Sequence, residues 1–258
     1  MTAAGPPAPA TLGVSAAQAQ ALDGAAAAAG VPPALLMTLA GFQLARLAWR
    51  RTRGAGPIVV LAGGGNNGGD GLAAARHLAA WGVEVRAVLV ADRAGLREPA
   101  AAELDRAQRC GVAVGDGDGD GALGPALAGA RLILDGLLGT GLRDAPRPRQ
   151  AAAIRATAAA GPVPVLSIDV PSGLDGTTGR VHDPCVRAAD TAMLGIPKHG
   201  CLVAPRAVVG RLWVVDIGIP PGAYRSIGAE GPGPAGGDWQ RLRPTGRQGP
   251  GGATRCAR

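Results

Sequence analysis

Asn66 and Asn67 are the only two asparagines in a chain of 258 residues, and both lie in a glycine-rich stretch. An apolar run at Ile58–Ala62 and three glycines precede them, and an alanine-rich segment follows. This order predicts a strand, a tight loop and the start of a helix. Free backbone N–H groups at a helix N-terminus bind anions, and glycines let a phosphate approach the backbone closely. We therefore expect a phosphate or nucleotide site formed by Asn66, Asn67, Gly68, Gly69 and Asp70.

Three further polar side chains follow apolar segments. Asp135 comes after residues 131–134, Asp169 after residues 163–168, and Lys198, the only lysine in the chain, after a short apolar segment and a glycine-containing turn. Any one such aspartate could simply stabilise a turn or cap a helix. If the segments are parallel strands, however, their carboxyl ends lie at one edge of the sheet, where ligands bind in α/β proteins.

Alternating apolar and helical patterns provide the elements that position these residues. Ser15 and Gln18 form a capping-box pattern ahead of an alanine run, and Pro32-Pro33 marks the start of a second helix. We interpret both helices as core packing. Further helices are expected at residues 72–81, 97–109 and 150–160, between strands at 58–62, 83–90, 112–114, 131–134, 163–168, 191–194 and 211–217. The alternation predicts an α/β fold with a mostly parallel sheet covered on both faces.

Charge and composition exclude several classes of protein. The net charge is +7 and the pI about 10.4, but the arginines are scattered and only 2% of residues are aromatic, so we expect no nucleic-acid partner. The four cysteines have no CxxC spacing. No basic residue precedes Arg46, and the apolar segment at 34–44 is shorter than the roughly 20 residues that span a bilayer. We therefore expect a soluble cytoplasmic protein with no membrane partner.

Two other motifs permit different interpretations. Gly63, Gly65 and Gly68 satisfy the GxGxxG fingerprint, and Asp92 follows the next expected strand, as the ribose-binding acid of an NAD-dependent oxidoreductase would. The sequence GDGDGDG at 115–121 copies the first half of a calcium loop, but Leu127 stands where the bidentate glutamate belongs. We interpret the second motif as a low-complexity surface loop.

Five ordered motifs, over about residues 12–219, resemble the NAD(P)H-hydrate epimerases, also called the YjeF N-terminal domain. They are GGGNNGGDGLAAARHL, DGLLGTGL, SIDVPSGLDGTTG, TAMLGIPKHG and VVDIGIP. The resemblance implies a Rossmann-like three-layer sandwich, often a homodimer. It also implies interconversion of the R and S forms of NADH or NADPH hydrated at C6 of the nicotinamide ring, so that an NAD(P)H-hydrate dehydratase acting on the S form can clear both.

The resemblance also assigns roles to single residues. The phosphates and ribose of the hydrate would bind residues 66–70 and the segment Gly139, Thr140, Gly141, Leu142, Arg143, Asp144 and Ala145. A potassium ion would be held by Asn67, Asp135 and Ser172, whose oxygen atoms suit a hard cation. Asp169 would contact the nicotinamide portion, and we take it as the acid/base, with Lys198 positioning or tuning it. The family's Met-Glu-Asn-Ala-Gly motif reads Met37-Thr38-Leu39-Ala40-Gly41 here.

The expected organisation is an epimerase-like domain at residues 14–228 between two disordered tails, at 1–13 and 229–258. Residues 238–244 faintly resemble the opening of the dehydratase domain of bifunctional relatives, so a truncated bifunctional chain is one alternative. A non-catalytic nucleotide-binding or scaffold module is another. The presence of all of Asn67, Asp135, Asp169 and Ser172 argues against that role.

Overall fold

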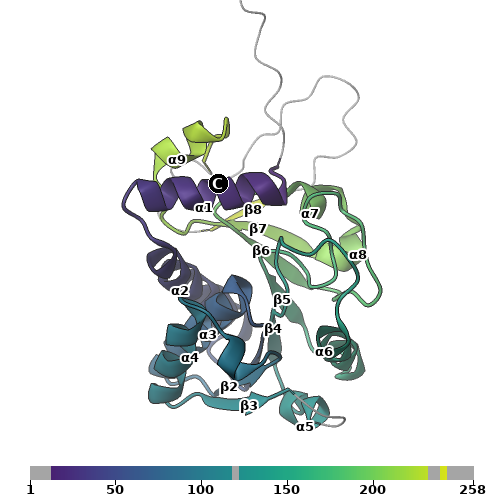
Figure 1. Ribbon diagram of the computed structural model, residues 1–258. Coiled ribbons are helices and arrows are strands. Elements are labelled where there is room, and N and C mark those ends of the chain that lie inside the picture. The colour runs from purple at the N-terminus through teal and green to yellow at the C-terminus, as the bar shows by residue number, and fades with distance from the viewer. Residues whose placement is uncertain (1–12, 118–121, 232–238, 243–258) are drawn as a thin grey trace, which may run out of the picture.

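The computed structural model describes residues 13–117, 122–231 and 239–242. Within them, eight strands form a sheet in the order β3-β2-β1-β4-β5-β6-β7-β8, and every pair is parallel except β7 with β8 (Figure 1). The strands are β1 Ile58–Ala62, β2 Val85–Leu89, β3 Ala113–Asp116, β4 Leu132–Gly136, β5 Val165–Ile168, β6 Asp190–Leu194, β7 Arg211–Val215 and β8 Trp239–Leu242. The prediction of an α/β fold with a mostly parallel sheet is confirmed.

Helices cover both faces of the sheet, with α2, α3 and α4 on one face and α5 and α6 on the other (Figure 1). The helices are α1 Ala16–Ala28, α2 Pro33–Thr52, α3 Asn66–Ala80, α4 Ala100–Arg109, α5 Leu123–Leu127, α6 Pro148–Ala159, α7 His199–Val203, α8 Arg206–Val209 and α9 Pro221–Ser226, with a 3₁₀ turn, η1, at Arg93–Gly95. The expected three-layer sandwich is therefore present. Helix α1 crosses the sheet edge and packs beside α9.

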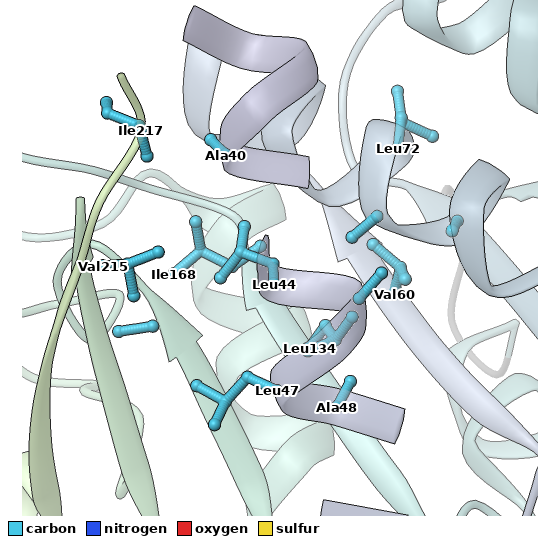
Figure 2. Packing of buried hydrophobic residues seen from close by; sticks show 14 of the residues in the cluster. Ala40, Leu44, Leu47, Ala48, Val60, Leu72, Leu134, Ile168, Val215 and Ile217 are labelled. Atoms are coloured by element: carbon cyan, nitrogen blue, oxygen red, sulfur yellow. The ribbon is translucent and has the colours of Figure 1, made fainter. Parts of the chain in front are cut away.

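Strand β1 shows how the sequence builds two cores. Its five residues are all buried, and successive side chains of a strand point to opposite faces. Ile58 and Val60 belong to the cluster under α2 and α3, whereas Val59 and Leu61 belong to the cluster under α5 and α6. Figure 2 shows the first cluster, in which Leu44 of α2 lies among side chains from several strands.

The starts of the first two helices agree with the sequence. Ser15 caps α1 in a reciprocal capping box with Gln18, and Pro33 occupies the first turn of α2. Helix α3 differs from expectation, because it begins at Asn66 instead of residue 72. Glycine is a poor helix former, so the glycines of this stretch favoured a loop. Close packing nevertheless requires glycine here, since a Cβ at Gly68 would collide with the carbonyl oxygen of Gly63.

The region after residue 228 also differs from the expected disordered tail. Trp239–Leu242 forms β8, which pairs antiparallel with β7 from Leu212 to Val215. The N-terminal tail up to residue 12, residues 118–121 of the calcium-like motif and the last sixteen residues lie outside the described parts of the chain. Asp116 of that motif ends β3 and pairs with Arg93 at 3.2 Å. Among the described helices, none alone is long and apolar enough to cross a membrane. Helices α1 and α2 reach that length and apolarity only when they are taken together, and they are bent by 112° relative to each other.

Candidate active site

A cavity of about 1270 Å³ lies at the carboxyl ends of β1, β4, β5 and β6. Its walls include Asn66, Asn67 and Asp70 of α3, the predicted segment from Gly139 to Ala145, and the side chains of Asp169 and Lys198. Helix α1 contributes a further wall through residues between Ser15 and Asp23. The structure therefore brings together the polar clusters that the sequence placed at separate strand ends. A volume of this size exceeds that of a typical drug-sized pocket and can hold an extended ligand such as a dinucleotide.

One end of the cavity is suited to an anion. Helix α3 opens at its N-cap Gly65 without a side-chain cap, so its first N–H groups and the positive end of its dipole are available to a ligand. Asn66 is exposed at this point, and the exposed side chains of Arg143 and Arg147 lie on the cavity wall. Arg147 was not among the residues predicted from the sequence. These features fit the binding of a diphosphate.

Gly68 and Gly69 belong to the same turn of α3 but do not line the cavity. A Cβ at Gly68 would strike the Gly63 carbonyl, and a Cβ at Gly69 would lie 2.6 Å from the sulfur of Met37. Their observed role is to let β1, α2 and α3 pack closely. Met37, the first residue of the altered Met-Thr-Leu-Ala-Gly motif, is itself part of the cavity wall.

Asp135 and Ser172 lie in the wall behind the cavity and are bonded to each other. The Ser172 hydroxyl donates to Asp135 Oδ1 at 2.5 Å, and the Ser172 N–H donates to Oδ2 at 2.9 Å. Ser167, which is aligned with Asp135 across β4 and β5, donates its hydroxyl to Oδ2 at 2.8 Å. Burial raises the pKa of Asp135, although these hydrogen bonds oppose the rise.

These residues fit a potassium ion. Asp135 is fully buried, and the hydrogen-bond donors to it among the described residues are neutral hydroxyl and N–H groups, so its charge is uncompensated. Asn67 donates from Nδ2 to the Leu138 carbonyl at 2.9 Å, which leaves its amide oxygen for another partner. The Ser172 hydroxyl lies 3.3 Å from the same carbonyl. Carboxylate, amide, hydroxyl and carbonyl oxygens are thus adjacent, as a hard cation requires.

Asp169 and Lys198 form the charged centre of the cavity. Lys198 Nζ lies 2.5 Å from Asp169 Oδ1, and the two side chains are 4% and 13% exposed. Lys198 also donates to the Leu194 carbonyl at 2.6 Å, and the Leu194 N–H donates to Asp169 Oδ1 at 2.9 Å. Asp169 has a left-handed backbone with φ of 65°, which is uncommon outside glycine. The position of the Asp169 carboxyl group is therefore fixed by the ion pair with Lys198 and the hydrogen bond from Leu194.

Two more carboxyl groups face this pair. The pKa of Asp70 is raised well above its usual range, first by burial and then by the charges of Asp169 and Asp23. Burial also raises the pKa of Asp23, and the positive charge of Lys198 partly offsets that rise. The interpretation of α1 as core packing holds for its buried residues Leu22 and Ala26, but Asp23 lines the cavity. Asp23 is the only charged residue among the first 45, a signal that could have identified it.

Asp92, the acid of the alternative dinucleotide fingerprint, lies elsewhere. It is exposed, caps η1 by accepting from the Ala94 N–H at 3.1 Å, and does not line the cavity. His77 packs edge-on against Phe42 and tilted against Trp81, and it does not line the cavity. The geometry therefore gives no support to the oxidoreductase alternative.

Fold and site together define an α/β protein with a nucleotide-sized cavity at the carboxyl edge of a parallel sheet. The chain belongs to the family described as "YjeF-related protein N-terminus", which matches residues 33–200. It is 39% identical over 196 residues to an NAD(P)H-hydrate epimerase of Dehalogenimonas lykanthroporepellens, covering 75% of this chain and 76% of the relative. It is 38% identical over 217 residues to an NAD(P)H-hydrate epimerase of Clavibacter michiganensis, covering 80% and 90%.

Other relatives are longer than this chain. It is 39% identical over 206 residues to a bifunctional NAD(P)H-hydrate repair enzyme of Hyperthermus butylicus, covering 77% of this chain but 37% of that protein. Two further bifunctional relatives are covered to 39% and 37% of their length. A solved structure of the yeast protein ynu0 has the same fold, with a TM-score of 0.78 at 24% identity, over 89% of this chain and 99% of that one.

Proposed function

We propose that this protein is an NAD(P)H-hydrate epimerase, an isomerase that interconverts the R and S forms of hydrated NADH or NADPH. The observation that carries the proposal is the ion pair of Asp169 and Lys198 within a cavity whose other end is the uncapped N-terminus of α3. One ligand can then bind its diphosphate at α3 while its reacting ring reaches Asp169. The names of the epimerase relatives support the same activity.

The chemistry starts from the carbon that carries the hydroxyl. C6 of the hydrate bonds both to that hydroxyl and to the ring nitrogen, so it is a hemiaminal carbon. Loss of the hydroxyl, helped by an acid and by the nitrogen lone pair, gives an iminium ion, and water can add again to either face. A carboxyl group within hydrogen-bond reach can move the protons in these steps. The proposal gives this role to Asp169, whose carboxyl group is held by Lys198 and by the Leu194 N–H.

Potassium belongs to the proposal as a bound ion held by Asn67, Asp135 and Ser172. When bound, it would supply the positive charge that the buried Asp135 lacks. The chain's own part is to fix the segment after β4, since Ser172 Oγ accepts from the Leu138 N–H at 2.9 Å and Asn67 donates to the Leu138 carbonyl. That segment leads directly into the residues expected to hold the phosphates.

We further propose a homodimer and a functional partner, an NAD(P)H-hydrate dehydratase that consumes the S form. The word "bifunctional" in the names of the longer relatives agrees with two activities in one repair system. A cytoplasmic location is part of the same proposal, and the free thiols of Cys110, Cys185 and Cys201 agree with a reducing compartment. Sedimentation equilibrium of the purified protein tests the dimer.

The activity is tested by supplying the pure R hydrate together with a separate S-specific dehydratase. We expect this protein to speed conversion of the R hydrate to NADH or NADPH many-fold over the dehydratase alone, and Asp169→Asn to remove the gain. A rate that does not change on adding the protein would overturn the proposal. A stoichiometric hydride transfer to or from NAD, in the absence of hydrate, would instead favour an oxidoreductase.

A further inference from the structure

Asp70 carries a buried carboxyl group that lines the cavity. The residue is 8% exposed and forms part of the cavity wall. Its carboxyl group makes no hydrogen bond or ion pair with any other residue that the structure describes. Removing an ionised carboxylate from water without a compensating partner is so unfavourable that the group takes up a proton instead. The surroundings of Asp70 therefore favour the neutral form of its carboxyl group, which faces whatever occupies the cavity.

Asp169, in the same cavity, has the opposite environment. It has a cation, Lys198, at 2.5 Å and a backbone N–H donor, that of Leu194, at 2.9 Å. Both contacts come from donors, so Asp169 accepts hydrogen bonds where the Asp70 carboxyl group has no partner among the described residues. The two carboxyl groups therefore have different surroundings. Such a pair is an arrangement by which one site can both donate and accept protons.

We propose that Asp70 is the acid that protonates the departing C6 hydroxyl of the hydrate, while Asp169 accepts a proton from the water that adds. The inference rests on the proposed epimerase function and names a second catalytic residue for it. The two carboxyl groups come from different elements, Asp70 from α3 and Asp169 from the end of β5. Such a pair can serve an epimerase, because one group supplies a proton to the departing hydroxyl and the other takes a proton from the water that adds.

The step balances without a further reactant. As the C6–O bond breaks, its electron pair stays on the oxygen, which takes the proton of Asp70 and leaves as water, while the ring nitrogen's lone pair forms the C6–N double bond. A water oxygen then bonds to C6, the double-bond pair returns to nitrogen, and the water's proton passes to Asp169. The enzyme now holds Asp70 ionised and Asp169 protonated. Turnover in the reverse direction, or exchange with water in the open cavity, restores the first state.

The charged groups around Asp70 come from four places in the fold. After burial itself, the groups that act on its pKa are Asp169, Asp23 of α1, Lys198 and Glu103 of α4. Glu103 is compensated, since Arg76 and Arg106 lie 3.1 and 2.7 Å from its oxygens. Asp23 lies before residues 33–200, the part that matches the family, and its negative charge favours the protonated form of Asp70. Removing that charge lowers the pKa of Asp70 without touching its carboxyl group.

The test compares wild type, Asp70→Asn and Asp23→Asn in the coupled assay with the R hydrate. We expect Asp70→Asn to lower kcat at least about 100-fold, as loss of a general acid does, with the Kd for ADP-ribose within about threefold of wild type. In wild type, kcat/KM should fall as the pH rises through the pKa of Asp70. In Asp23→Asn that fall should begin at a lower pH. A wild-type kcat in Asp70→Asn would overturn the inference. So would a fall of kcat/KM that begins at the same pH in Asp23→Asn as in wild type.

The outcomes separate this inference from the proposed function. If wild type does not speed conversion of the R hydrate, the epimerase proposal itself fails. If wild type is active and Asp70→Asn is equally active, only the role of Asp70 fails. A measurement without substrate adds an independent arm: NMR titration of 13C-labelled aspartate carboxyl groups should show one signal, absent in Asp70→Asn, that titrates well above the ordinary aspartate range. Titration of that signal in the ordinary aspartate range would also overturn the inference.

Discussion

Lys198 Nζ lies 2.5 Å from Asp169 Oδ1, and both side chains are almost completely enclosed. Lys198 is the single lysine of the chain, so its ammonium group is used where a compact charge meets a carboxylate in a buried site. The pair joins the end of β5 to the segment after β6, and both border the cavity. Loss of either charge therefore affects both the cavity and the contact between these two segments.

The first prediction is that Asp169→Asn abolishes epimerisation but leaves hydrate binding within about tenfold, a loss of about 1.4 kcal/mol. The amide keeps the shape and can still accept from the Leu194 N–H, but it cannot take up a proton. Coupled kinetics and calorimetry with the hydrate measure the two effects. Lys198→Met is the matched variant: it removes the cation and keeps the carboxyl group, so some activity should remain. If Asp169→Asn turns over at the wild-type rate, Asp169 is not the acid/base.

The second prediction concerns potassium. A ligand that binds only the native state raises its stability by mass action, so the melting temperature should be higher in potassium chloride than in sodium chloride at equal ionic strength. Asp135→Asn keeps the shape of the buried side chain and removes its charge, and the difference between the salts should disappear. Asp190→Asn is a matched control, because Asp190 is another buried carboxylate that already has Arg211 at 2.7 Å. Equal melting temperatures of wild type in both salts, with and without hydrate, would contradict the ion site.

Much of this fold could be predicted from the sequence. Apolar runs of four to six residues, separated by helical segments, predict parallel strands, and Asp135 and Asp169 follow such runs. The exact start of α3 could not be predicted, since glycine is a poor helix former and the contacts that require it at Gly68 and Gly69 exist only in the folded chain. Strand β8 was missed because its four residues have no apolar alternation of their own and depend on pairing with β7.

The site was predicted less completely than the fold. Residues that end strands, such as Asp169, are positioned by topology, which the sequence pattern indicates. Asp23 lies on a helix that only the folded chain brings over the cavity, and Arg147 follows a proline-rich segment with no periodicity. The burial of Asp70 could not be inferred either, because its neighbours in sequence are glycines and its enclosure comes from other elements.

The third prediction is that Asp70→Asn stabilises the fold above about pH 5. Burial and neighbouring carboxylates raise the pKa of Asp70 in the folded state above its unfolded value. As the pH rises through the ordinary aspartate range, the unfolded chain therefore releases this proton before the native state does. The free energy of unfolding falls from there until the pH passes the pKa of Asp70 in the folded state. Asparagine has no such penalty. Melting temperatures should be equal near pH 3, where both forms are neutral, and higher for the variant near pH 7; a lower value for the variant at pH 7 would contradict the buried neutral acid.

The last prediction separates the two adjacent asparagines. Asn66 is exposed at the start of α3, where aspartate is favourable for the helix dipole but repels a bound phosphate. Asn66→Asp should therefore keep or raise the melting temperature while weakening ADP-ribose binding at least about tenfold. Asn67 instead donates Nδ2 to the Leu138 carbonyl at 2.9 Å, and aspartate has no donor for that bond. Asn67→Asp should lower stability by about 1 kcal/mol, as loss of one hydrogen bond does, and potassium should restore part of that loss. Calorimetric titration of ADP-ribose and thermal melts in both salts measure each effect, and the same response at both positions would show that the two amides do not have separate roles.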